Sequence, residues 1–225
     1  MLDVACGTGV IARAAARAVG PTGSVSGVDV APDMLEVARR VAVDGSAIDW
    51  HEADAAVLPM PDASCDVVLC QMGLMFMEDP AGALGEMHRV LAPAGRVLIS
   101  TPGRIQPLFE AMEKAIVDNL NPDLGGFVRA VFSMHEPSAL GGLLSEAGFS
   151  DVAWTEYQAV LSLPGPAEFL WSYINLTPMG PLVAQASEAA QVAMERQVVE
   201  AWTPDVDDGI TRIDQPMALA WGLRS

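Results

Sequence analysis

The sequence predicts an α/β protein built on a doubly wound, mostly parallel β-sheet that is flanked by helices. Two observations support this fold class. Across residues 1–102, short apolar runs alternate with segments of helical character, which is the pattern of successive βα units. Near the end of the chain, two long strand-like segments form a hairpin-like finish, so we expect an antiparallel last strand. A length of 225 residues and an apolar fraction of 51% suit one large α/β domain.

The first two βα units lie on either side of a glycine-rich turn. Residues 1–5 are mostly apolar and predict the first strand, and residues 10–19 (VIARAAARAV) predict the first helix because they are rich in alanine and arginine. The stretch GSVSGVDV predicts a second strand that ends at Asp29. Residues 31–42 predict a helix with five apolar side chains on one face. These side chains are Met34, Leu35, Val37, Ala38 and Val41.

The next elements continue the alternation. Residues 46–55 (SAIDWHEADA) predict a third strand, and residues 65–71 (CDVVLCQ) predict a fourth that is buried on both faces. Residues 79–91 predict a helix, because an aspartate followed by proline is typical of an N-cap and first helical position. Residues 95–101 (GRVLIST) predict the fifth strand.

The second half of the chain has a different character. Residues 105–135 indicate inserted helix and loop, and residues 136–149 predict a short helix. Residues 150–163 predict a long strand, residues 165–202 a mostly helical insertion, and residues 217–225 the last strand. We therefore expect helical insertions after the fifth and the sixth strands.

Charge and cysteine content narrow the classes of function. The chain has 12 Lys and Arg against 29 Asp and Glu, a net charge of −17, which disfavours nucleic acid and anionic membrane surfaces as partners. The cysteines Cys6, Cys65 and Cys70 form no CxxC pair, so we expect neither a metal site nor a disulfide framework. Free thiols and the absence of a signal-like segment favour a cytoplasmic location.

The stretch LDVACGTG, from Leu2 to Gly9, carries the most specific signal. A strand, a GTG turn and a helix form an anion or nucleotide site, because the turn lets a ligand approach the backbone. Residues 7–12 also fit the loose GxGxxA dinucleotide pattern. However, Asp3 would repel a pyrophosphate and attract a positively charged amino group. The residues favour a ligand with an amino group, and a nicotinamide-dependent oxidoreductase remains the alternative.

Four ordered stretches resemble the motifs of class I S-adenosylmethionine (SAM)-dependent methyltransferases. They are LDVACGTG, GVDVAPDM, HEADAAVLPMPDASCDVV and the segment that begins CQMGLMFMEDP. The similarity is greatest to the small-molecule branch related to ubiquinone and menaquinone biosynthesis methyltransferases. It covers residues 1–102 strongly, and residues 133–163 and the last strand more loosely. The resemblance implies a Rossmann-like fold, SAM as cofactor and S-adenosylhomocysteine (SAH) as product.

The resemblance also implies which residues hold the cofactor. Asp29 would accept both ribose hydroxyls, Asp54 would accept the adenine amine, and Met34 would pack near the adenine. The fourth strand of this branch is often followed by Gln-Gln-Gly, and Met72 replaces the second glutamine here. The full expected set is Asp3, Ala5, Cys6, Gly7, Gly9, Asp29, Val30, Met34, Ala53, Asp54, Ala55, Gln71 and Met72.

Methyl transfer from a sulfonium is an in-line displacement, so positioning supplies much of the acceleration. The methionines after the fourth strand favour a small, lipophilic acceptor, because methionine adapts to irregular ligands. We expect Met75, Phe76, Phe132 and Tyr173 to line its site. A general base is needed only if the acceptor must lose a proton. His135 is then the first candidate, with Tyr157, Tyr173 and several aspartates as rivals.

We expect a single methyltransferase domain over residues 1–225. Residues 1–102 would form the cofactor-binding core, and the insertions 103–136 and 164–212 would form the acceptor site and its cover. Because the first strand begins within two residues of Met1, the N-terminal lid helices usual in this family are expected to be missing, either naturally or because the sequence is a truncated version of a longer one. Uncovered apolar surface would then favour a homodimer. A SAM-binding regulatory module without transferase activity is a further alternative.

Overall fold

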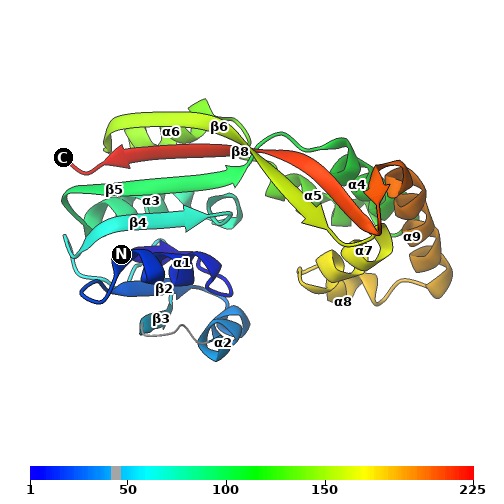
Figure 1. Ribbon diagram of the computed structural model, residues 1–225, viewed down its shortest axis with the longest axis horizontal. Coiled ribbons are helices and arrows are strands. Elements are labelled where there is room, and N and C mark those ends of the chain that lie inside the picture. Colours follow the sequence, from blue (N-terminus) through cyan, green and yellow to red (C-terminus); the bar gives the residue numbers. More distant parts are fainter. Residues whose placement is uncertain (42–46) are drawn as a thin grey trace. The chain divides into compact units, whose positions relative to one another are not determined.

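The computed structural model describes residues 1–41 and 47–225 (Figure 1). The expected end of the second helix at Ala42 and start of the third strand at Ser46 lie outside these residues. The described chain packs as two compact units, although the sequence predicts one domain over residues 1–225. Unit 1 comprises residues 1–101, 136–156 and 218–225, and unit 2 comprises residues 102–135 and 157–217. The two expected insertions, 103–136 and 164–212, fall almost entirely in unit 2.

The strands form one sheet in the order β3-β2-β1-β4-β5-β8-β6, with β7 paired to β8. Their bounds are β1 (Leu2–Val4), β2 (Val25–Asp29), β3 (Ile48–Glu52), β4 (Cys65–Gln71), β5 (Leu91–Pro102), β6 (Ser150–Leu163), β7 (Val206–Asp207) and β8 (Ile210–Leu223). The first five strands are parallel, and β8 runs antiparallel beside β5, as the sequence predicts (Figure 1). The strand order reverses between β1 and β4, and open α/β sheets bind ligands at such a point, beyond the carboxyl ends of the strands.

The helices of unit 1 are α1 (Val10–Val19), α2 (Pro32–Arg40), η1 (Leu74–Phe76), α3 (Pro80–Val90) and α6 (Pro137–Glu146). Helix α1 buries only small side chains, Ala12, Ala15 and Ala16, which pack with Val25 of β2. Such a face lets the helix axis lie close to the sheet. The start of α1, which follows the glycine turn directly, is therefore held firmly against β1 and β2.

The structure corrects the expectation that five apolar side chains of helix α2 share one buried face. Leu35 and Ala38 are buried, but the side chains of Val37 and Val41 are 41% and 46% exposed. The reason is geometric: two residues along a helix turn by about 200°, so Val37 lies opposite Leu35. Val41 follows the end of the helix at Arg40.

Unit 2 contains the helices α4 (Pro107–Asn119), η2 (Pro122–Leu124), α5 (Gly125–Val131), α7 (Pro166–Asn175), α8 (Gly180–Val183), α9 (Glu188–Trp202) and η3 (Thr203–Asp205). Their apolar faces form a core of their own, in which Met112, Met194 and Trp202 are fully buried. The Trp202 indole N–H donates to the carbonyl of Leu108 at 2.8 Å, which satisfies its polar atom inside the core.

Strand β8 begins seven residues earlier than the sequence suggests, at Ile210 and not at Met217. Along its first half, Thr211, Ile213 and Gln215 are buried, while the residues between them are exposed. This is a half-buried strand with period two, but two of its inward residues are polar. The hydrophobic pattern therefore does not reveal it. No helix in the described part of the chain is long and apolar enough to cross a membrane.

Candidate functional site

The turn between β1 and α1 has an unusual backbone. Ala5, Gly7 and Gly9 all have positive φ, at 55°, 54° and 83°. A Cβ at Gly9 would also lie 2.4 Å from Cη2 of Trp50, so this position has room only for glycine. The Cys6 N–H donates to the carbonyl of Val28 at 3.0 Å, which ties the turn to β2. Backbone of this kind can approach a ligand closely at the start of a helix.

Asp29, at the end of β2, connects this turn to the next one. Its Oδ2 accepts the Gly7 N–H at 2.7 Å, and its Oδ1 accepts the Ala31 N–H at 2.9 Å. These two bonds fix the orientation of the carboxylate. An ionised carboxylate offers about four acceptor positions, so two remain for the hydroxyl groups of a ligand.

Asp3 is a buried carboxylate in the middle of β1, with a side chain that is 2% exposed. Its Oδ2 has no hydrogen-bond partner, while the carboxylate accepts a backbone hydrogen bond from Ala12 in the first turn of α1. Burial raises the pKa of Asp3 to about 7, and the charge of Asp29 adds to the rise. A buried oxygen without a partner carries a cost that a cationic donor would remove. The site therefore fits a ligand with an ammonium group, such as the methionine end of SAM.

The turn after β3 lies beside these groups. The Ala53 N–H donates to the carbonyl of Asp29 at 3.1 Å, and Oδ1 of Asp54 accepts the Ala56 N–H at 2.8 Å. Ala55 follows in the same turn and is half-buried. Asp54 and the 69% exposed Val30 thus lie beyond neighbouring strands at one edge of the sheet.

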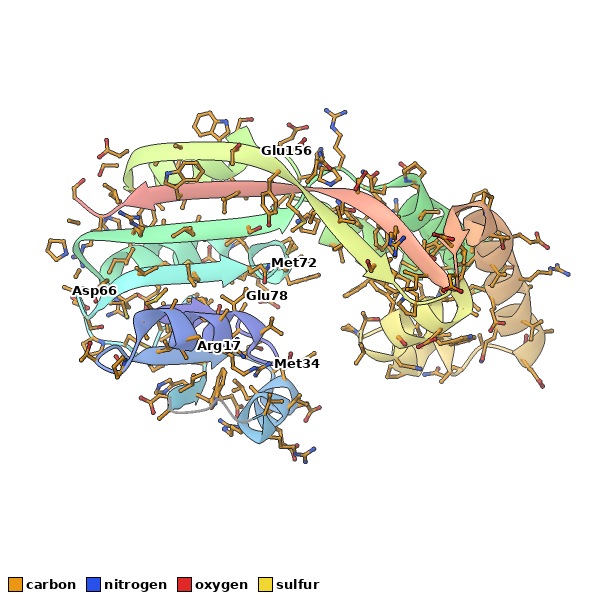
Figure 2. The ribbon with its side chains drawn as sticks, viewed as in Figure 1. Arg17, Met34, Asp66, Met72, Glu78 and Glu156 are labelled. Atoms are coloured by element: carbon orange, nitrogen blue, oxygen red, sulfur yellow. The ribbon has the colours of Figure 1, made fainter. Side chains whose placement is uncertain are left out.

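The segment after β4 completes this edge. Gln71 is exposed, and Met72, with a φ of 55°, donates its N–H to the carbonyl of Ser100 at 2.8 Å. A Cβ at Gly73 would lie 2.4 Å from Cβ of Ala5, so this segment packs directly on the turn after β1. Figure 2 shows Met34 and Met72 at the end of the sheet toward which the β4 arrow points, and Asp66 at the opposite end. The structure therefore brings all thirteen expected cofactor residues to the carboxyl edge of β1 to β4.

Unit 2 contains a pocket of about 400 Å³. It is lined by Arg104, Ile105, Glu110, Glu113, Arg129, Phe132 and His135. Nε of Arg129 and Oε1 of Glu113 form an ion pair at 2.8 Å, and Nδ1 of His135 lies 3.0 Å from the carbonyl of Phe132. A carbonyl oxygen can only accept, so Nδ1 is the donor in this contact. Two of the expected acceptor-site residues, Phe132 and His135, thus share one pocket.

The other expected acceptor-site residues do not line this pocket. Tyr173 packs its ring against Phe127 and Phe169, and its hydroxyl is buried without a partner. Burial raises the pKa of Tyr173 to about 12, so it stays protonated at neutral pH and is a poor general base. Met75 is buried and Phe76 is 48% exposed, both in η1 of unit 1.

Sequence reasoning did not identify several residues of these sites. Trp50 and Arg13 contact the glycine turn, and Arg104, Glu110 and Glu113 line the pocket of unit 2. None of them belongs to a contiguous motif, so no local signal pointed to them.

The cysteines and acidic groups give no sign of other chemistry. All three cysteines are buried and unpaired, and burial raises the pKa of the Cys6 and Cys70 thiols to about 12. Among the side chains that the structure describes, no three His, Cys, Asp or Glu residues are grouped as metal ligands would be.

Comparison with known proteins gives three kinds of match. The family model described as "Methyltransferase domain" matches residues 2–99. Demethylmenaquinone methyltransferase of Thermus thermophilus is 36% identical over 163 residues, covering 67% of this chain and 74% of that protein. Demethylmenaquinone methyltransferase of Staphylococcus epidermidis is 34% identical over 163 residues, covering 67% and 68%.

Solved structures match over nearly the whole chain. A putative methyltransferase from Bacillus halodurans has a TM-score of 0.59 and 19% identity, covering 99% of this chain and 91% of that one. Phosphoethanolamine N-methyltransferase 2 of Haemonchus contortus, in complex with S-adenosyl-L-methionine, has a TM-score of 0.57 and 18% identity, covering 100% and 48%. At these identities the likeness shows the fold alone.

Proposed function

Because this chain belongs to the class I SAM-dependent methyltransferases and methylates a small molecule, we propose that its acceptor is a lipophilic ring compound of the demethylmenaquinone type. The names of its relatives support this class of acceptor. Ile105 and Phe132, the apolar side chains that line the pocket of unit 2, support it as well. Such side chains offer contact area to an apolar ring.

The observation that carries the cofactor assignment is the buried, unpartnered oxygen of Asp3 beside a glycine turn anchored by Asp29. In this proposal Asp3 holds the ammonium group, Asp29 accepts the ribose hydroxyls, and Asp54 accepts the adenine amine. Val30 and Met34 pack on the adenine. When bound, SAM supplies a methyl group on a sulfonium, which makes that carbon electrophilic.

We assign the pocket of unit 2 to the acceptor. The ring of Phe132 and the side chain of Ile105 give it apolar contact, and His135 presents a basic nitrogen at Nε2. His135 would take up the proton that an acceptor hydroxyl or carbon loses on methylation. Positioning by these side chains supplies much of the acceleration, because the reacting atoms must be in line.

An acceptor screen tests the function. The protein is incubated with SAM and candidate ring compounds, including a demethylmenaquinone, and products heavier by one CH₂ are sought by mass spectrometry. We expect methylation of a lipophilic ring compound. SAH binding without any methylated product would instead favour a regulatory SAM-binding protein.

Variants of the pocket test its role. His135→Gln and Phe132→Ala are expected to lower turnover about tenfold or more without changing the dissociation constant of SAH. Ser133→Ala, in the same loop and exposed, is the matched control. If both pocket variants turn over like the control, the acceptor lies elsewhere.

A further inference from the structure

The indole of Trp50 lies against Gly9, at the end of the cofactor turn, and against Gly27 of the neighbouring strand β2. Trp50 is in β3 and is paired in register with Gly27 of β2. A Cβ at Gly27 would lie 2.5 Å from Cζ3 of the indole, and a Cβ at Gly9 would lie 2.4 Å from its Cη2. Gly27 has no positive φ, so backbone conformation does not demand glycine there. The absence of a side chain at Gly27 instead makes room for the ring.

The surroundings of the indole are small as well. Its ring packs with the cluster formed by Ala12, Ala15 and Ala16 of α1 and by Val25 of β2. Larger side chains at these positions would displace the ring. Gly9, Gly27 and these small residues therefore form the packing site of the indole, which we call its seat. The far edge of the indole thereby reaches the end of the turn at Gly9.

Arg13 supports the turn from the helix. Its Nη1 donates to the carbonyl of Thr8 at 2.7 Å, and a Cβ at Gly9 would lie 2.8 Å from the same Nη1. The turn has three residues with positive φ within five positions, and one of them, Ala5, is not glycine, so its surroundings must hold that conformation. Trp50 and Arg13 are the side chains that contact its last residue.

We propose that Trp50 is a positioning residue for the cofactor: its indole holds the glycine turn in the form that receives the methionine end of SAM. This inference rests on the cofactor site proposed above. Trp50 acts through Gly9 and Gly27 and need not touch the reacting atoms. Its loss should weaken cofactor binding more than it slows the chemical step.

SAH binding by calorimetry tests this directly, because it requires no acceptor. Trp50→Leu is expected to raise the dissociation constant of SAH about tenfold, and Trp50→Phe about threefold, since a phenyl ring fills part of the seat. At saturating SAM, kcat should stay within about twofold of the parent while KM for SAM rises. SAH should also change the tryptophan fluorescence of the parent protein, and Trp50→Phe should abolish most of that change.

A double-mutant cycle uses the opposite side of the contact. Gly27→Ala places a methyl group where the indole lies, so it should also weaken SAH binding. In the Trp50→Leu background the same change should have a smaller effect, because the ring is gone and only the 3.0 Å approach to Sγ of Cys6 remains. Gly85→Ala is the matched control, since a Cβ at Gly85 meets nothing within 4 Å. Trp202→Phe, in the core of unit 2, should lower the melting temperature without changing the SAH dissociation constant.

The outcomes separate the two proposals. If the parent protein does not bind SAH, the proposed cofactor site is wrong. If the parent binds SAH and the folded Trp50 and Gly27 variants bind it equally well, the positioning role is wrong and Trp50 is an ordinary core residue. If Trp50→Leu does not fold, Trp50→Phe and Gly27→Ala give the same decision.

Discussion

At the scale of single residues, the proposed cofactor site depends on two carboxylates in very different surroundings. Asp29 is anchored by the backbone N–H groups of Gly7 and Ala31, whereas Asp3 is buried with one oxygen unpartnered. The protein therefore carries an unsatisfied group in its interior, which costs stability. Such a cost is expected at a binding site, where the ligand supplies the missing partner.

The first prediction concerns Asp3 and pH. Its folded pKa, about 7, lies above the ordinary value of 3.8, so the protonated form favours folding. The contribution of Asp3 to stability should be greatest below about pH 4, fall as the pH rises to about 7, and stay low above it. Asp3→Asn removes this dependence. In urea unfolding, the free energy of unfolding is compared between variant and parent at pH 5 and at pH 8. The difference should shift in favour of the variant by roughly 2 to 3 kcal/mol from the lower to the higher pH.

The exposed Asp66 of β4 provides the control for this experiment. Asp66→Asn should shift the stability of the protein by a similar small amount at both pH values. An Asp3→Asn difference that is the same at pH 5 and pH 8 would contradict the raised pKa.

The second prediction concerns Asp29. Asp29→Ala should weaken SAH binding by roughly 1–3 kcal/mol, because ligand hydroxyls and the Gly7 N–H lose their acceptor. Calorimetry measures the change. Asp33→Ala, an exposed carboxylate in the first turn of α2, is the control and should bind SAH like the parent. Unchanged affinity in Asp29→Ala would count against the assigned position of the ribose.

At the scale of elements, local signals predicted helix starts well and the long β8 strand poorly. Asp79 was expected to cap α3, and its Oδ1 accepts the Gly82 N–H at 2.8 Å, with Pro80 as the first helical residue. The cap is readable because all its atoms lie within four residues. Thr211 and Gln215 of β8 are buried because of the register of the strand in the sheet. No local sequence pattern reveals that register.

The third prediction tests this cap. Asp79→Ala should lower the free energy of unfolding by about 1 kcal/mol, because the Gly82 N–H loses its partner at the start of α3. Thermal or urea unfolding measures the loss. Glu78→Ala, one residue earlier and exposed, should cost only a few tenths of that amount. Equal effects in the two variants would show that the capping bond contributes little.

At the scale of the whole molecule, the two compact units have separate cores and separate candidate sites. The family model matches residues 2–99, which lie in unit 1, and the thirteen expected cofactor residues lie in the same unit. The pocket proposed for the acceptor lies in unit 2, whose core is built around Trp202 and its aromatic neighbours. The expected homodimer stays a prediction.

The fourth prediction is a map of SAH binding by hydrogen exchange. SAH at about 100 times its dissociation constant should stabilise the protein by about 2.7 kcal/mol. We expect the earliest and largest gain in protection in peptides that span residues 3–12, 25–35 and 53–58. Residues 188–202 of α9 serve as the internal reference. Protection confined to the reference peptide would contradict the placement of the cofactor.

The sequence by itself determined the fold class and the edge of the sheet at which the proposed cofactor residues gather. It could do so because each of these signals is contiguous: a strand, a glycine turn with positive φ, and an acidic residue at the end of a strand. The family resemblance added the cofactor SAM and the roles proposed for Asp29 and Asp54.

Only the tertiary structure decided the rest. The seat of Trp50 against Gly9 and Gly27 depends on the pairing of β2 with β3 and on the small face of α1. The pocket around His135 depends on helices α4 and α5 packing in unit 2, and its charged residues follow no motif. Contacts between side chains distant in sequence are set by packing, and packing leaves no local pattern in the chain.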